Sequence, residues 1–161
     1  MGRPITTEYL LGRKLVTGVS DPSGLSLTFE LDGNRVFANV EATERLCGRS
    51  KVVPPGVLHG VLDDLAHATV AVMNKRVGLT RESRVCLLKP LYAQDRFRAD
   101  GTIFRAAHDA GEVFVVQVRV LNKREQLCVE GELEIFALTA EQVRRMTPDG
   151  MIPADLKRYL P

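Results

Sequence analysis

The most regular pattern of hydrophobic positions lies in residues 54–74, which read PPGVLHGVLDDLAHATVAVMN. Hydrophobic or small residues recur there every three or four positions, as they do on the buried side of a helix: Leu58, Leu62, Leu65, Ala66, Thr69, Val72 and Met73. Two prolines and Gly56 stand where such a helix would begin. The pattern predicts a long, largely buried helix over about residues 56–76.

The chain before this helix alternates between hydrophobic and polar residues, which predicts strands. Residues 25–32 alternate in this way and run into Asp32-Gly33-Asn34, which is typical of a hairpin turn leading to a second strand over residues 35–43. Further upstream, Asp21-Pro22-Ser23-Gly24 predicts another turn. Residues 8–19 mix hydrophobic residues with two glycines and fit either a helix or a strand.

The chain after the helix predicts four more strands. Gly78 indicates the end of the helix, and residues 85–92 (VCLLKPLY) form a strand that Pro90 interrupts or ends. The last three strands fall within residues 97–138, where one face is continuously hydrophobic. Turns separate them at His108–Gly111 and Asn122–Arg124. A curved antiparallel sheet is therefore expected.

The C-terminal residues predict short helical turns that follow the sheet. Thr139 can cap a helix over AEQVRRM, and the last residues contain one more amphipathic turn. The chain has 161 residues, of which 45% are hydrophobic, enough for one domain with its own core. We expect a lead-in over residues 1–24, the core over 25–138 and a tail over 139–161.

Charge, hydrophobic spans and cysteine content limit the partners, locations and metal sites that can be expected. The net charge is only +2, with basic and acidic residues interspersed, so nothing favours nucleic acid as a partner. No hydrophobic span is long enough for a membrane helix, and the N-terminal charges are too close together for a secretory signal, so a cytoplasmic protein is expected. The three cysteines are widely spaced without a CxxC pair, which favours free thiols and no metal site.

The predicted helix carries polar groups that a buried helix must pair or use. His59, Asp63 and His67 follow one another at intervals of four, and Asp64 adds a second carboxylate. Each has a purely structural alternative. His59 can cap a helix, the two aspartates can stabilise a helix dipole, and His67 can be a hydrogen-bonded core residue. Three ligands at this spacing could bind a metal, but the HExxH form and a thiolate are both missing.

The order of two strands, a long helix and further strands resembles the hotdog fold, an α+β architecture in which a curved antiparallel sheet wraps around a central helix. Residues His59 to Asn74, the segment Pro90 to Gly101 and the two closing strands are similar to hotdog acyl-CoA thioesterases of the phenylacetyl-CoA type. A helix wrapped by one sheet leaves sheet edges uncovered, so we expect a homodimer, or a tetramer built from two dimers.

The resemblance implies a thioester site on the central helix. His59 would hold the substrate-binding turn, and the backbone N–H groups of Gly60 and Val61 would stabilise the oxyanion at the helix start. The sequence departs from the family in having Val61 after His59-Gly60, where many relatives have a second glycine. The family's acid falls at the position of His67 or Ala68. Asp63 or Asp64 could take that role, His67 could be the base, or the site could bind thioesters without cutting them.

Coenzyme A contains phosphate groups, and arginine and lysine side chains bind phosphate groups. The basic residues that could hold it near a tunnel mouth, or could simply be exposed, are Arg81, Arg84, Lys89, Lys123 and Arg124. No cofactor is expected apart from the coenzyme A carried by the substrate. An acyl-carrier protein could present the same thioester.

The leading hypothesis is therefore an acyl-CoA thioesterase of undetermined acyl length. The alternative is a non-catalytic module that binds or senses acyl-CoA, similar to the effector domain of the malonyl-CoA-responsive regulator of fatty-acid synthesis. A hydroxyacyl thioester dehydratase is disfavoured. Those enzymes pair an upstream loop histidine with an acid after a PGVL-like turn, whereas the loop before Pro54 has no histidine and Val61 occupies the place of the acid.

Overall fold

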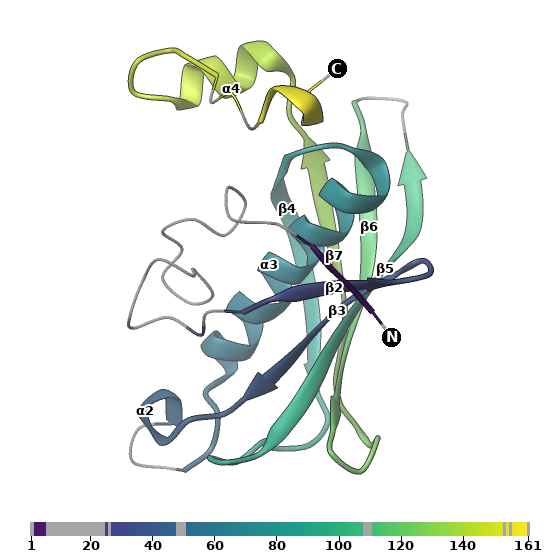
Figure 1. The fold of residues 1–161 in the computed structure, drawn as a ribbon, viewed down its shortest axis with the longest axis vertical. Helices are drawn as coiled ribbons and strands as arrows, with labels where there is room; N and C mark the ends of the chain where they lie inside the picture. The colour runs from purple at the N-terminus through teal and green to yellow at the C-terminus, as the bar shows by residue number, and fades with distance from the viewer. Residues whose placement is uncertain are drawn as a thin grey trace.

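The centre of the molecule is a 20-residue helix, α3 (Pro55–Asn74), which packs against one face of an antiparallel sheet (Figure 1). The computed structural model describes residues 2–5, 25, 27–47, 51–107, 111–152, 154 and 156–160. The helix begins at Pro55, one residue before the predicted start at residue 56, and ends where Lys75 adopts the left-handed conformation, with φ 55°. It therefore stops slightly earlier than the position that Gly78 indicated.

Within the described residues, the sheet has seven strands in the order β1-β2-β3-β5-β6-β7-β4, and every neighbouring pair is antiparallel. Their bounds are β1 (Arg3–Ile5), β2 (Phe29–Asp32), β3 (Arg35–Glu41), β4 (Gly78–Leu87), β5 (Arg96–Ala107), β6 (Val113–Asn122) and β7 (Leu127–Ala137). The helix separates β3 from β4, and β4 lies at the opposite end of the sheet beside β7. This arrangement confirms the predicted α+β class and the wrapped central helix.

The core lies between α3 and the inner face of the sheet. Leu62 and Leu65 of the helix are fully buried, as are Leu133 and Ile135 of β7. The helix approaches β5 closely at Gly101, because a Cβ atom there would lie 2.6 Å from Thr69 Oγ1. The absence of a side chain at this position thus sets how near the helix lies to the sheet.

Several elements differ from the sequence expectations. The strand predicted over residues 85–92 begins seven residues earlier, at Gly78, and ends at Leu87. The short β1 and the one-turn helix α2 (Glu44–Cys47) were not predicted. The predictions for residues 8–19 and for the turn at 21–24 lie outside the described residues, as does most of the turn at His108–Gly111.

The C-terminal tail follows β7 and lies over the end of the sheet where α3 terminates (Figure 1). It contains α4 (Ala140–Met146) and a short 3₁₀ helix, η2 (Lys157–Tyr159). Thr139 caps α4 as predicted: its hydroxyl accepts from the N–H of Gln142, whose side chain accepts from the Thr139 N–H.

Two further expectations can be compared with the structure. The three cysteines are free thiols, with Cys47 and Cys128 buried and Cys86 exposed. Among the residues that the structure describes, no helix combines the length and hydrophobicity needed to cross a membrane.

Candidate active site

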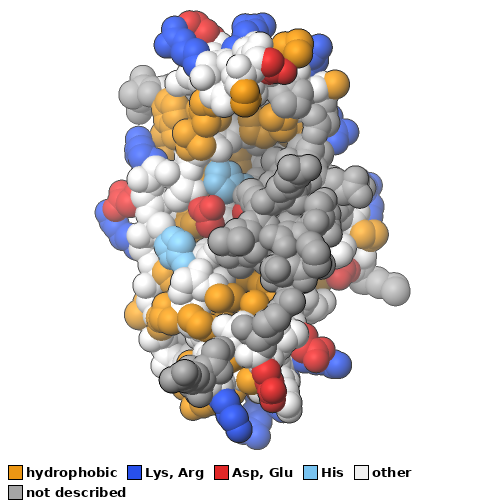
Figure 2. Space-filling model, turned by 90° about the vertical axis from the view of Figure 1, so that its left-hand side faces the viewer, with side chains coloured by type: hydrophobic (Ala, Val, Ile, Leu, Met, Phe, Trp, Pro, Cys, Tyr) orange, Lys and Arg blue, Asp and Glu red, His pale blue; other side chains and the backbone are white. Residues whose placement is uncertain are grey.

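A line of ionisable side chains runs along the side of α3 that faces strand β4. His59, Asp63 and His67 are spaced by four residues, so they lie one above another on the helix surface. Figure 2 shows two histidine side chains with an acidic side chain between them, all visible on this face of the molecule. The side chain of Asp63 is 33% exposed and that of His67 is 15% exposed. The line is therefore accessible although its helix is mostly buried.

Strand β4 contributes two hydroxyl groups to this line because it contains a β-bulge. Thr80 pairs with Ile135 and Ser83 pairs with Leu133, and both partners are fully buried on the helix side of the sheet. Residues three apart on a regular strand point to opposite faces, but the register shifts between Thr80 and Glu82. Arg81 is the extra residue. Thr80 and Ser83 consequently both face α3, as bulges near functional sites often arrange.

Thr80 links the aspartate to the second histidine. Its hydroxyl donates a short hydrogen bond to Asp63 Oδ1, and Thr80 Oγ1 lies 3.0 Å from His67 Nε2. A hydroxyl has a single hydrogen, so His67 Nε2 must be the donor to Thr80. Asp63 Oδ1 and His67 Nε2 are 3.9 Å apart. The three side chains form a fixed unit in which Asp63 Oδ2 accepts no hydrogen bond from the described residues.

The first histidine of the line has its own hydroxyl partner. His59 Nε2 lies 3.3 Å from Ser83 Oγ, and His59 is exposed. One helical turn separates it from Asp63, so its imidazole lies beside any group bound over that carboxylate. We call His59, Asp63, His67, Thr80 and Ser83 the helix–strand cluster.

The second carboxylate of the helix does not belong to this cluster. Asp64 is only 4% exposed, and one residue of α-helix turns its side chain about 100° away from Asp63. Between the two aspartates that the sequence offered, the structure brings Asp63 alone to the two histidines and the hydroxyls. Of the two positions where the resemblance places the family's acid, Ala68 is fully buried and His67 belongs to the cluster.

The expected oxyanion donors are not at the helix start. The helix begins at Pro55, which puts Gly60 and Val61 in its second turn, where backbone N–H groups donate to carbonyls four residues earlier. Val61 is also fully buried. The prediction that these two residues offer free N–H groups is wrong, because the proline-containing segment is itself the first turn. Instead, Val57 N–H donates to Pro54 O and Gly56 N–H has no acceptor among the described residues.

The five basic residues proposed for coenzyme A fall into two groups. Lys89, Lys123 and Arg124 line one cavity of about 420 Å³ together with the exposed ring of Tyr92. The strand end and the β6–β7 hairpin meet there, since Lys89 N–H donates to Cys128 O at 3.1 Å.

Arg81 and Arg84 are separate from that cavity and lie on β4. Arg81 Nη2 is 2.6 Å from Glu134 Oε2, and Arg84 Nη2 is 2.5 Å from Glu82 Oε1. Their charges are already compensated by neighbouring carboxylates, so the structure does not group them with the other three.

Within the described residues, no group of three or more histidine, cysteine, aspartate or glutamate side chains is arranged to hold a metal ion. The line His59, Asp63 and His67 is instead connected through the two hydroxyls. Sequence reasoning missed Thr80 and Ser83, which lie in a segment that was interpreted as a connection between helix and strand. The sequence did contain a signal for them, because two hydroxyl residues follow a helix whose polar residues recur every four positions.

No family model and no curated protein matches the chain. Several solved structures do match it. A Haemophilus influenzae thioesterase superimposes with a TM-score of 0.67 at 13% identity, over 81% of this chain and 87% of that one. The Escherichia coli PaaI protein of the phenylacetic acid degradation operon gives 0.60 at 12% identity, over 70% and 83%.

A Streptococcus mutans protein bound to acetyl CoA gives a TM-score of 0.58 at 20% identity, over 67% of this chain and 84% of that one. At these identities the likeness concerns the fold. The chain has the hotdog fold, as the sequence resemblance implied.

Proposed function

We propose that this protein is an acyl-CoA thioesterase whose substrate lies over the helix–strand cluster. One observation carries the proposal: Asp63 accepts from the hydroxyl of Thr80 through one oxygen, its second oxygen accepts no hydrogen bond from the described residues, and its side chain is 33% exposed. A carboxylate positioned in this way can remove a proton from water. A similar protein with this fold is bound to acetyl CoA, which supports acyl-CoA thioesters as the substrate class.

The reaction follows from the positions of the side chains. Asp63 Oδ2 accepts a proton from a water molecule, whose oxygen attacks the thioester carbonyl carbon. The tetrahedral intermediate then expels the coenzyme A thiolate, which takes up a proton, and the carboxylic acid is released. Thr80 and His67 fix the orientation of Asp63 through their chain of hydrogen bonds. His59 supplies a hydrogen-bond donor for the charge that develops on the carbonyl oxygen.

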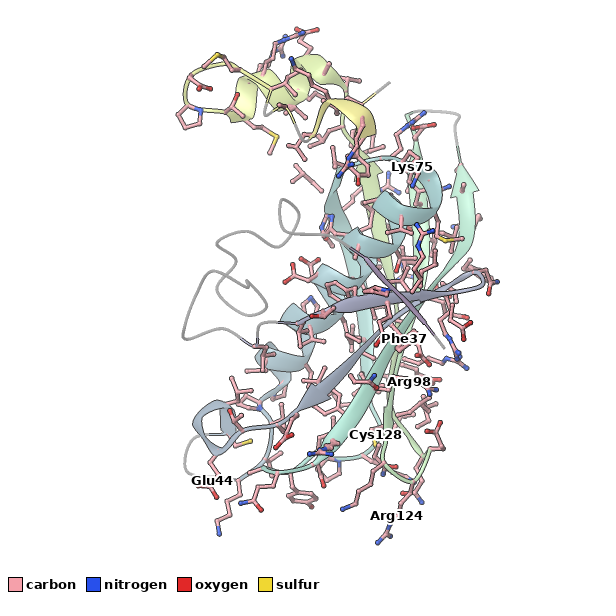
Figure 3. The ribbon with its side chains drawn as sticks, viewed as in Figure 1. Phe37, Glu44, Lys75, Arg98, Arg124 and Cys128 are labelled. Carbon is pink, nitrogen blue, oxygen red and sulfur yellow. The ribbon has the colours of Figure 1, made fainter. Side chains whose placement is uncertain are left out.

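The basic cavity supports a place for the coenzyme A phosphates. Lys89, Lys123 and Arg124 offer three positive charges, and Tyr92 offers an exposed aromatic ring for the adenine. Figure 3 shows Arg124 at the hairpin end of the molecule. The cavity neighbours the first turn of α3, because Val53 N–H donates to Leu91 O and Ala93 N–H donates to Lys51 O. About 12 Å of helix then separates Pro55 from Asp63.

A homodimer formed along β4 would complete this site. Strand β4 is at an edge of the sheet, and Leu79 and Leu87 in the strand and Leu88 directly after it are each nearly half exposed. Edge strands with exposed hydrophobic residues favour pairing with another strand. Pairing of two β4 strands would bring a second copy beside the helix–strand cluster, and two such dimers could form a tetramer.

The decisive experiment measures coenzyme A release from a panel of acyl-CoAs and one acyl-carrier protein thioester. A thiol reagent reports release, with a substrate-free sample correcting for the exposed Cys86. We expect hydrolysis by the native protein and its loss in Asp63→Asn. Glu130→Gln, an exposed carboxylate on β7, is the matched control and should retain the rate. Equal rates in Asp63→Asn and the native protein would exclude the proposed site.

Acyl-CoA binding without hydrolysis is the second candidate. It is favoured by the family's acid position, where this chain has His67 or the buried Ala68 and therefore no carboxylate. Thermal stabilisation by acyl-CoAs with no coenzyme A release above background would establish binding alone. Absence of both stabilisation and release in folded protein would rule out both functions.

A further inference from the structure

A hydrophobic cavity of about 290 Å³ lies beside the helix–strand cluster, at the C-terminal end of α3. Its walls come from three parts of the chain: the helix through His67, the beginning of β4 through Leu79, and the tail through Leu138, Val143 and Met146. Figure 2 shows hydrophobic side chains gathered on this face beyond the upper histidine. The tail therefore closes a space that the sheet and helix alone would leave open.

The cavity and the reactive groups share atoms and backbone. His67 lines the cavity and also donates to Thr80, which holds Asp63. Leu79 lines the cavity and immediately precedes Thr80 in β4. A thioester carbonyl at Asp63 would thus have the cavity on one side. The basic cavity of Lys89 and its neighbours lies near the opposite end of the helix.

The chemistry of the walls selects an uncharged hydrocarbon. Leu138 and Val143 are 8% and 5% exposed and form the inner part, while Met146 and Leu79 are about half exposed and lie toward the opening. Among the described residues that line the cavity there is no aspartate, glutamate, lysine or arginine. A cavity of about 150 Å³ with hydrophobic walls accepts benzene, so this one has room for a medium-length chain or a single aromatic ring.

We propose that this cavity binds the acyl group of the substrate, and that α4 sets the longest acyl group that fits. The proposal rests on the thioesterase function above and adds its substrate class: straight-chain acyl groups of medium length or one-ring aromatic acyl groups, without a terminal charge. Each methylene that enters the cavity raises kcat/KM about fourfold. The gain stops when the chain reaches the inner wall, and longer substrates react more slowly.

The test is a chain-length profile of kcat/KM from acetyl-CoA to dodecanoyl-CoA, with succinyl-CoA included. Val143→Phe fills the inner part and should lower the rate with long acyl groups at least tenfold more than the rate with short ones. Val143→Ala and Met146→Ala enlarge the cavity and should move the optimum toward longer chains. Met151→Ala is the matched control, since Met151 belongs to the same tail, is exposed and does not line the cavity.

A second measurement introduces the same substitutions into the Asp63→Asn protein, in which acyl-CoAs should not be hydrolysed. Calorimetric titration then measures how tightly each variant binds acyl-CoAs. This second readout separates the two proposals. Hydrolysis with one unchanged profile in all variants would overturn the cavity assignment and leave the thioesterase function standing. Absence of hydrolysis with binding that follows acyl length would keep the assignment and overturn the thioesterase. If Val143 and Met146 variants alter only the oligomeric state, the cavity holds a second copy of the chain and the assignment is wrong.

Discussion

Two aspartates on opposite faces of the sheet have contrasting surroundings. Asp100 in β5 is 2% exposed and lies near three guanidinium groups, with Arg98 Nε at 3.0 Å, Arg35 Nη1 at 3.8 Å and Arg119 Nη2 at 4.0 Å. Asp63 in α3 is 33% exposed and contacts the hydroxyl of Thr80. The first carboxylate is enclosed by positive charge, whereas the second is held by one hydroxyl and remains accessible.

The difference separates a structural carboxylate from one that can react. The oxygens of Asp100 are occupied by charged donors and the residue is buried, which makes it a good anchor for three strands but leaves it out of reach of a bound molecule. Asp63 has one oxygen that accepts no hydrogen bond from the described residues, and its side chain is partly exposed. If burial and the number of partners were the only criteria, Asp100 would be selected as the candidate functional carboxylate. Solvent accessibility and the kind of partner select Asp63 instead.

The largest expected effect comes from replacing each aspartate by asparagine and applying both readouts. Asp63→Asn should reduce kcat about 10²–10⁴-fold, because a general base is lost, while its free energy of unfolding stays nearly unchanged. Asp100→Asn should lower the free energy of unfolding by about 2–3 kcal/mol with little change in kcat per folded molecule. Urea titration and steady-state rates measure the two quantities. Similar profiles for the two variants would contradict the contrast.

Thr80→Val should have the next largest effect. It removes the hydroxyl that orients Asp63, and hydrogen bonds to a charged group contribute about 1.5–3 kcal/mol. We expect kcat to fall roughly 10- to 100-fold, with KM changing less. Thr102→Val, on the face of the sheet that carries Asp100, is the matched control and should leave kcat unchanged. Equal losses in both variants would show that β-branched substitution in the sheet, not the hydroxyl, is responsible.

Ser83→Ala should have a smaller effect. The contact with His59 is long and exposed, so losing it should cost about threefold in kcat. His59→Gln should cost more than Ser83→Ala, because the histidine is the proposed donor to the substrate. The reverse order would assign the direct role to Ser83.

Salt should produce the smallest difference. In 1 M NaCl the stability penalty of Asp100→Asn should shrink by about 0.5 kcal/mol, because the arginines around it are partly exposed and screened. The rate ratio between native protein and Thr80→Val should stay constant, since the hydroxyl carries no charge. A salt-dependent rate ratio would mean that the helix–strand cluster relies on charge in the way that Asp100 does.

Sequence reasoning recovered the elements with long regular patterns and lost those whose pattern is broken. The central helix was predictable because hydrophobic residues recur through all of α3, and Thr139 was predictable as a cap. The beginning of β4 was not, since its bulge interrupts the alternation between Thr80 and Ser83. The oxyanion donors were misplaced because the prolines were interpreted as preceding the helix, whereas Pro55 is its first residue.

The candidate site shows the same limits. The line His59, Asp63 and His67 followed from spacing alone. Neighbouring carboxylates on a helix differ only by rotation, so the choice between Asp63 and Asp64 required the position of β4. The grouping of Lys89 with Lys123 and Arg124 depended on the pairing of strands distant in sequence, which no local pattern contains.

The bulge at Arg81 determines whether both hydroxyls of the site face the helix. Thr80 and Ser83 are three residues apart in β4, and they point to the same face of the sheet only because the bulge adds one residue between them. The identity of residue 81 is therefore less constrained than its existence. A change of side chain there alters one ion pair with Glu134, whereas deletion would exchange inside for outside along one half of the strand. In this segment, the number of residues matters more to the position of the two hydroxyls than the side chain of residue 81 does.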